Sequence, residues 1–337
     1  MYLSALWGIL KLIFYKTFYA DKFRYPLLIA VSDSYIAIAS LKQSSLLSYS
    51  LFPINSFNLD INNLSSHNQN QLFNNIELYK KQHYCCSCTF PIDYVLIKNI
   101  DIPLDSSQFL YETLYQEISL SLMANDIFLD YIINNESKTH CSVTAVIVKN
   151  DILASYYKFI KKIGSVISKI SIDVYVIANM LLVIIPQAQT FFNSKYQISS
   201  SNPNLQNFNT NNILFLCLEQ TKIMAILIYN GNFQDYFKQD ISELVVKYDD
   251  GLKILLDRVN AYLADHGLNE VLGQYLIIIA DQLANNVNIA LSIKHYCQTK
   301  IFSFGEIYQY IYLNSVNSDI PQADLNLLYK AISLSYY

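Results

Sequence analysis

Glycine and arginine are both scarce in this chain. There are 7 glycines in 337 residues, about 2% against the usual 7% or so. A loop that cradles phosphate needs glycine, because its backbone must approach the ligand closely. The only arginines are Arg24 and Arg258, too few for the clusters that clamp phosphate bidentately. Both shortages argue against a protein built around a phosphate-binding loop.

Charge is also sparse. Charged residues make up 15% of the chain, against roughly 25% in an average soluble domain. The net charge of −4 argues against a general nucleic-acid binder, whose binding surface is basic. Hydrophobic residues reach 53%, which excludes a disordered chain and supplies a core for two or three domains. An aromatic-rich, charge-poor chain favours surfaces that bind protein partners.

Six cysteines do not indicate a disulfide framework, which belongs to short secreted chains. Reduced thiols in a cytoplasmic protein are the interpretation we favour. His83, Cys85, Cys86 and Cys88 crowd together and raise the question of a metal site. On a strand, Cys86 and Cys88 face one way and Cys85 the other, so the ligands cannot converge as zinc requires. We therefore expect structural thiols and no metal.

Residues 1–25 have the apolar periodicity of an amphipathic helix with a basic flank. The apolar stretch is too short to span a bilayer and is interrupted by lysines, and we expect neither a signal peptide nor a transmembrane helix. One interpretation is a helix lying on an anionic membrane surface; the other is a helix docked on its own domain or on a partner. The residues expected to face the membrane are Leu3, Leu6, Trp7, Leu10 and Phe14, with Lys11 and Lys16 beside them.

The rest of the chain alternates strands and helices in two similar halves. Each half opens with a strand–turn–strand pattern and later has amphipathic helices, which predicts an α/β fold with an internal duplication. A polar stretch at 193–212 without periodicity predicts a linker. The expected organisation is a first core domain from 26–84 and 173–192, an inserted α/β subdomain at 85–172, and a second domain at 213–337.

This order resembles the actin-like (ribonuclease H-like) ATPase fold, and in particular the type IV pilus assembly protein PilM family. The resemblance runs along nearly the whole chain from Leu27. It is most specific in the middle, in the order and spacing of the segments FPIDYVLIKNIDIP, LDYIIN, VTAVIVKND, KKIGSV and ISIDVYVIANML.

The nucleotide motifs of that family are degraded here. Ala30 stands where the first motif has its acid, and Ser32 replaces a loop glycine. Glu219 replaces a glycine of the second motif and would direct a carboxylate at phosphate, which it repels. The third motif, a pair of glycines, is replaced by Ala280 and Asp281. The positions of this degenerate pocket are Ser32, Asp33, Ser34, Tyr35, Glu219, Gln220, Thr221, Ala280 and Asp281.

Other interpretations of these carboxylates are weaker. Asp33 and Asp281 could form a paired-carboxylate site across a cleft, but acids in turns usually only cap them. We therefore expect no catalytic residues and no cofactor, with ATP disfavoured. The alternative is an ATP-binding actin-like switch whose nucleotide state controls partner binding.

The resemblance implies a scaffold at the cytoplasmic face of a bacterial inner membrane. Such a protein would serve a type IV pilus, or a related secretion or DNA-uptake machine. It would bind the cytoplasmic N-terminal peptide of a PilN-like bitopic protein in a groove between the core and the inserted subdomain. It would also link to the pilus motor ATPases and could form homo-oligomers.

Overall fold

The computed structural model describes fourteen segments of the chain. These are residues 27–32, 35–42, 45–53, 85–103, 110–122, 126–136, 140–163, 166–192, 211–219, 221–241, 247–268, 272–299, 301–313 and 320–336. The N-terminal segment predicted to be an amphipathic helix lies outside them. So do Asp33, Ser34 and Gln220.

The first half is built on a five-stranded sheet in the order β3-β2-β1-β4-β8. Strands β1, β2 and β3 are antiparallel neighbours, whereas β1, β4 and β8 run parallel. Strand β1 is entirely apolar and β4 is fully buried, as expected for strands covered on both faces, whereas β8 at the edge carries Ser168, Lys169 and Ser171 and is only partly buried. Their bounds are β1 Leu27–Val31, β2 Tyr35–Lys42, β3 Ser45–Pro53, β4 Cys86–Phe90 and β8 Ile167–Ile172.

The second half repeats this sheet strand for strand, in the order β11-β10-β9-β12-β13. A hairpin turn at Asn230 and Gly231 joins β10 to β11, and both residues have positive φ, as a tight turn of this kind requires. The duplication confirms the predicted actin-like fold. The bounds are β9 Ile213–Leu218, β10 Lys222–Tyr229, β11 Asn232–Asp240, β12 Leu276–Ala280 and β13 Ile301–Ser303.

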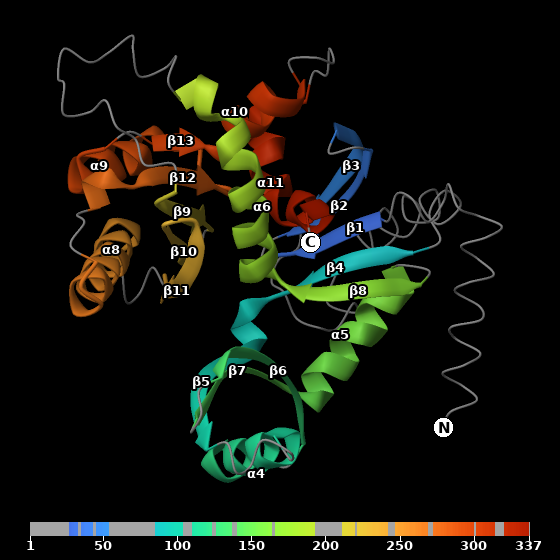
Figure 1. Ribbon diagram of the computed structural model, residues 1–337. Coiled ribbons are helices and arrows are strands. Elements are labelled where there is room, and N and C mark those ends of the chain that lie inside the picture. The colour runs from blue at the N-terminus through green and yellow to red at the C-terminus, as the bar shows by residue number, and fades with distance from the viewer. Residues whose placement is uncertain are drawn as a thin grey trace.

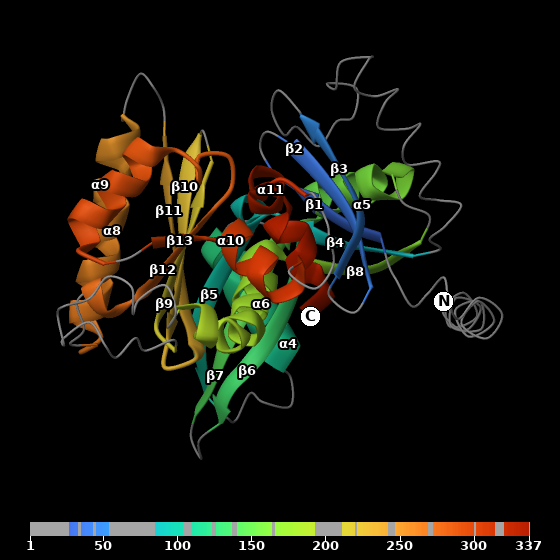
Figure 2. The same ribbon diagram turned by 90° about the horizontal axis from the view of Figure 1, so that it is seen from above.

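Two helices lie between the sheets, and others cover the outer faces (Figures 1 and 2). Helices α6 (Asp173–Gln187) and α11 (Gln322–Ser333) form the middle layer. On the outer side of the second sheet lie α8 (Tyr248–Asp265) and α9 (Val287–Cys297), and α5 (Asn150–Ile163) packs beside the first sheet. The short helix α10 (Phe304–Tyr308) packs on α11.

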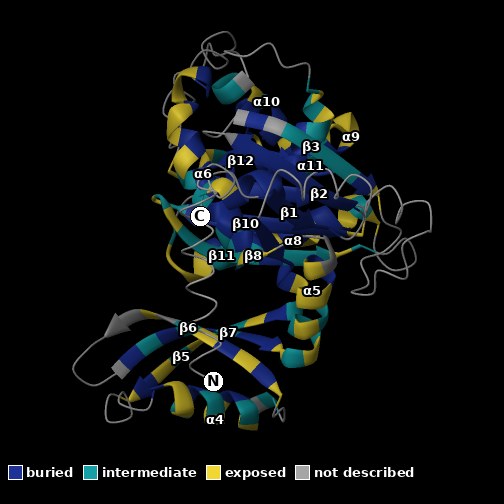
Figure 3. Cartoon of the chain, turned by 90° about the vertical axis from the view of Figure 1, so that its right-hand side faces the viewer, coloured by how far each residue is buried: buried dark blue, intermediate teal, exposed yellow. Residues whose placement is uncertain are grey.

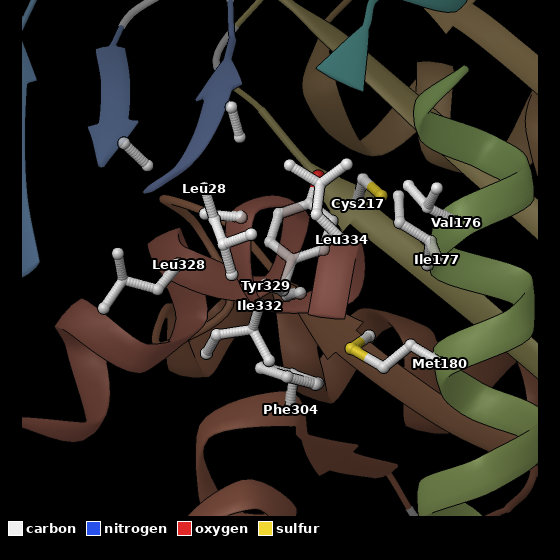
Figure 4. Close-up of a cluster of buried hydrophobic side chains, with 14 of the residues drawn as sticks. Leu28, Val176, Ile177, Met180, Cys217, Phe304, Leu328, Tyr329, Ile332 and Leu334 are labelled. Carbon is white, nitrogen blue, oxygen red and sulfur yellow. The ribbon is translucent and has the colours of Figure 1, made fainter. Parts of the chain in front are cut away.

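The middle layer explains why the largest core is continuous across both halves. Figure 4 shows Leu28 of β1, Val176 and Met180 of α6, Cys217 of β9 and Tyr329 of α11 converging on one cluster. Helix α6 has apolar residues around most of its circumference because both sheets contact it. It begins at Asp173 and continues one residue past Pro186.

A three-stranded antiparallel sheet, in the order β5-β7-β6, projects from the first half. Helix α4 (Leu110–Leu122) packs on one face of it and forms a separate small core with it (Figure 3). The other face is turned toward the body of the protein. The strands are β5 Val95–Pro103, β6 Ile127–Glu136 and β7 His140–Lys149.

The boundaries predicted for this subdomain, 85–172, are too wide. Strands β4 and β8 pair with β1 and with each other in the core sheet, and α5 packs on that sheet through Tyr156 and Phe159. The insertion therefore occupies only the stretch from β5 to β7. It follows the short helix η2 (Ile92–Tyr94) and ends where α5 begins.

The predicted linker 193–212 also ends earlier than expected. The Asn212 carbonyl accepts from the Leu276 amide at 2.9 Å, and its side chain accepts from Asn230 at 2.8 Å. Asn212 is therefore part of the second domain. Three further short helical segments complete the described chain: η5 Leu272–Gln274, η6 Gln309–Leu313 and η7 Leu334–Tyr336.

Candidate functional site

The turns that carry the degraded motifs meet at the centre of the molecule, between the two sheets. Ser32 ends β1, Tyr35 begins β2, Glu219 follows β9 and Asp281 follows β12. Apart from Thr221, which is exposed on the β9–β10 turn, the pocket positions that the structure describes are buried. The fold thus brings Ser32, Tyr35, Glu219 and Asp281 to one place, whereas Thr221 is exposed and Asp33, Ser34 and Gln220 lie outside the described residues.

Tyr35 and Asp281 join the two halves directly. The Tyr35 hydroxyl donates to Asp281 Oδ2 at 2.9 Å, and the Gln282 amide donates to Asp281 Oδ1 at 2.7 Å. Asp281 has φ +81, in the left-handed region that favours glycine. The backbone at Asp281 therefore has a conformation that glycine adopts freely.

Lys330 of α11 supplies the cation that the sequence analysis did not foresee. Its Nζ donates to Glu219 Oε1 at 2.9 Å and lies 3.6 Å from Asp173 Oδ2. Lys330 and Glu219 are each 1% exposed and Asp173 is 2% exposed. Asp173 also accepts from the amides of Ile92 and Val174. A lysine within the mostly apolar run LLYKAI of α11 was the available sequence signal.

The pKa values of this cluster follow from burial and pairing. Burial opposes the charged form of Lys330, but Glu219, Asp173 and Asp281 outweigh it and raise its pKa well above the usual value. Burial also raises the pKa of Glu219, and here Lys330 and Lys222 reverse the shift, so the net direction is downward. The cluster therefore holds an ionised Lys330–Glu219 pair.

Asp281 behaves differently because it has no cation of its own. Burial and the Glu219 charge raise its pKa to about 7, although Lys330, the Gln282 amide and the Tyr35 hydroxyl act in the opposite direction. Burial is also the main cause of the raised pKa of Tyr35. Neither group resembles a phosphate ligand, which must offer positive charge or free amide donors.

The ion pairs continue from this cluster toward the surface. Lys222 lies 3.5 Å from Glu219 Oε2 and also pairs with Asp93 of η2, which in turn pairs with Lys238 of β11. Burial would raise the pKa of Asp93, but the two lysines lower it overall. Asp93 therefore ties the base of the inserted subdomain to the second half.

Asp93 also borders two hollows at the junction between the inserted subdomain and the body. The larger, about 760 Å³, lies between the body-facing side of the inserted sheet and strand β11. Its lining is Ile92, Asp93, Val95, Ile97, Asn99, Thr144, Tyr175, Phe233, Gln234, Asp235, Tyr236, Lys238 and Arg258.

The smaller hollow, about 340 Å³, lies among the inserted sheet, the end of α4 and α5. It is mostly apolar, with Leu96, Leu122, Ile127, Ile147 and Ile152 in its lining. Asp93 and Val95 line both hollows, so the two lie on either side of the start of β5. The sequence analysis expected a groove here but did not identify its residues.

The crowded cysteines lie on strand β4 and just before it, and all six cysteines of the chain are buried free thiols. Burial raises the pKa of Cys86 to about 12, and the neighbouring Cys85 adds to the shift. In the described segments no three His, Cys, Asp or Glu residues are arranged to hold a metal ion. His83 lies outside those segments.

Among the helices that the structure describes, none is both long enough and apolar enough to cross a bilayer.

No protein-family model matches the sequence, and no curated protein matches it either. Among solved structures, a chain of the PilM–PilN type IV pilus biogenesis complex aligns with a TM-score of 0.60 at 9% identity, covering 92% of this chain and 97% of the other. A Bacteroides thetaiotaomicron protein with an actin-like ATPase fold aligns with a TM-score of 0.42 at 10% identity, covering 86% and 94%. The chain thus has an actin-like fold and resembles PilM in structure, as its sequence predicted.

Proposed function

We propose that this protein is a non-catalytic scaffold of a pilus or secretion platform, in which internal ion pairs take the place of a nucleotide. The observation that carries the proposal is the buried Lys330–Glu219 pair at the meeting point of the three degraded motifs. A phosphate group there would have to displace an ammonium from its carboxylate and would face the Glu219 charge itself. Both effects oppose ATP binding.

The partner in this proposal is the cytoplasmic N-terminal peptide of a PilN-like protein that spans the inner membrane once. Support comes from the similarity to a chain of the PilM–PilN complex and from the two hollows beside the inserted subdomain. An apolar hollow that adjoins a larger polar groove suits a peptide with one apolar anchor. The protein would lie at the cytoplasmic face of the membrane, with residues 1–25 contacting the lipid surface. It would connect the platform to its motor ATPases and would self-associate.

Calorimetric titration of the full-length protein with Mg-ATP tests the first part. We expect no saturable heat in the micromolar range, because Lys330 is already paired with Glu219 and the Glu219 carboxylate repels phosphate. Saturable heat would replace the scaffold with the nucleotide-controlled switch.

Site-specific photocrosslinking tests the second part. A benzophenone amino acid at Leu96, which lines the smaller hollow, is expected to capture the segment that precedes the membrane span of a single-pass protein. The same group at Leu120, 80% exposed on α4, is the matched control and should not capture it. Equal capture at both positions would remove the groove from the proposal.

A further inference from the structure

Strand β11 leaves one edge of the second sheet open beside the larger hollow. In the sheet order β11 has only β10 as a neighbour. Residues Phe233 to Tyr236 line the hollow consecutively, together with Lys238. Neighbouring residues of a strand point to opposite faces of the sheet. Four consecutive residues can therefore line one hollow only where the hollow runs along the edge of β11.

The register shows which main-chain groups of that edge point outward. The Ile241 amide donates to the Thr221 carbonyl at 2.6 Å, so residues 239, 237 and 235 also direct their main-chain groups toward β10. Residues 236, 238 and 240 direct theirs away. Two contacts agree: the Lys238 carbonyl accepts from Arg258 Nη1 at 2.8 Å, and the Tyr236 amide donates to Asp235 Oδ1 at 2.8 Å.

The Tyr236 carbonyl and the Lys238 amide remain at this edge without a partner in the described chain. In a parallel pair, one residue of the added strand donates to the carbonyl of a β11 residue and accepts from the β11 amide two positions further on. The Tyr236 carbonyl and the Lys238 amide therefore fit a single residue placed beside Phe237. On the opposite wall, the inserted sheet offers Val95 and Ile97 to an incoming side chain.

The charge in the hollow indicates what that strand should carry. Asp235 is half-buried, lines the hollow, and forms no ion pair within the described chain. Burial is the main cause of its raised pKa, while the amide of Tyr236 and the more distant His266 and Arg258 act in the opposite direction. A half-buried carboxylate without an ion pair is stabilised by an incoming cation. Asp93 is not available, because Lys222 and Lys238 already pair with it.

We propose that the larger hollow binds an extended partner segment as a parallel strand added to β11, with a lysine or arginine of that segment against Asp235. The inference rests on the proposed function, since the segment is the peptide of that proposal. It adds the mode of binding and the charge of the recognised residue.

Two short capped peptides serve as probes, Val-Lys-Val-Lys-Val-Lys-Val and the same sequence with Glu for Lys, each labelled for fluorescence polarisation against the full-length protein. The Lys probe should bind and the Glu probe should not. The Asp235→Lys variant should weaken the Lys probe at least tenfold and gain the Glu probe. Glu117→Lys, the same charge change on the exposed side of α4, is the matched control and should alter neither.

Main-chain pairing is tested by methylating the backbone nitrogens of the Lys probe at alternate residues. One of the two alternating patterns should abolish binding and the other should not, because an added strand uses every second amide. With a benzophenone at its N-terminal end, a parallel strand should crosslink to the tryptic fragment 223–238 rather than to 239–247.

Equal affinity for the two probes, no binding of either, indifference to both methylation patterns, or crosslinking to 239–247 would each overturn the inference. Failure here is distinct from failure of the proposed function. If a partner peptide is captured at Leu96 but probe binding does not respond to Asp235→Lys, the scaffold proposal holds and the β11 inference fails. If the probes bind as expected but no peptide is captured at Leu96, only the β11 site is supported.

Discussion

At the scale of single residues, Asp281 has a backbone conformation that is unusual for its type. Its φ of +81 is a conformation that glycine adopts freely and that aspartate adopts only with help from local hydrogen bonds. The Tyr35 hydroxyl and the Gln282 amide provide that help. The side chain thus occupies space that a glycine would leave open to a ligand.

The raised pKa of Asp281 also makes the stability of the protein depend on pH, and the direction of the pKa shift fixes the sign of that dependence. Its pKa in the folded protein, about 7, is above the ordinary value of an aspartate. Between pH 4 and 7 the folded state therefore retains a proton that the unfolded state has released, and stability falls as the pH rises through this window. Above pH 7 this contribution levels off.

The Asp281→Asn variant should lack this dependence, because the amide stays neutral. Between pH 5 and pH 8, we expect the free energy of unfolding of the wild type to fall by about 1 to 4 kcal/mol relative to that of the variant. Urea unfolding of both proteins at several pH values measures the difference. Curves that stay parallel across the range would show that Asp281 is already ionised at pH 5.

At the scale of secondary-structure elements, the sequence predicted the two halves that each open with a strand–turn–strand pattern and later have amphipathic helices. Apolar runs and turn residues are local signals, and β10, β11 and α8 contain strong ones. Which strand pairs with which is not local. Strands β4 and β8 were assigned to the insertion because they flank it in sequence, although they pair in the core sheet.

The candidate site was likewise predictable only where its signal follows the order of the chain. Its turns were found through the family resemblance, which follows chain order. Lys330, Asp93 and Asp173 were missed, because they come from α11, η2 and α6 and join the cluster only after folding. The pairs Lys330–Glu219 and Lys222–Asp93 are separated by 111 and 129 residues along the chain, and no spacing rule covers such distances.

The contact between α10 and α11 allows a test at the level of elements. A Cβ placed on Gly305 would lie 2.6 Å from the Gln322 carbonyl oxygen, at the start of α11. Gly305→Ala should therefore destabilise the protein by about 1–3 kcal/mol through overpacking. Urea unfolding measures this, with Gln309→Ala, exposed one turn later, as the control that should change little. Equal stability of Gly305→Ala and the wild type would mean that α10 and α11 can separate freely.

At the scale of the whole molecule, the buried ion pairs and the shared core bind the two halves together. Lys330 comes from the helix layer between the sheets, Glu219 from the second sheet, and Asp173 from the start of α6. The apolar cluster around them includes strands of both sheets. This arrangement favours a fixed angle between the halves rather than a hinge that a ligand would close.

Removing the central cation, Lys330, should greatly lower the free energy of unfolding. Lys330→Met leaves Glu219 and Asp173 buried with one cation fewer, and we expect a loss of about 3–5 kcal/mol of stability. Glu219→Gln in the same chain should recover part of it, so a double-mutant cycle should give a coupling of about 1–3 kcal/mol. Strictly additive effects would show that the pair does not contribute as a unit.

The six buried thiols have a use that their structural role does not suggest. Cys88 lies in the first sheet, Cys141 in the inserted subdomain, Cys217 in the second sheet and Cys297 at the end of α9, and each is reached only when its surroundings open. Alkylation followed residue by residue in a mass spectrometer would read the opening rate of each part separately. The native chain thus carries its own site-resolved probes of local unfolding, without a single engineered label.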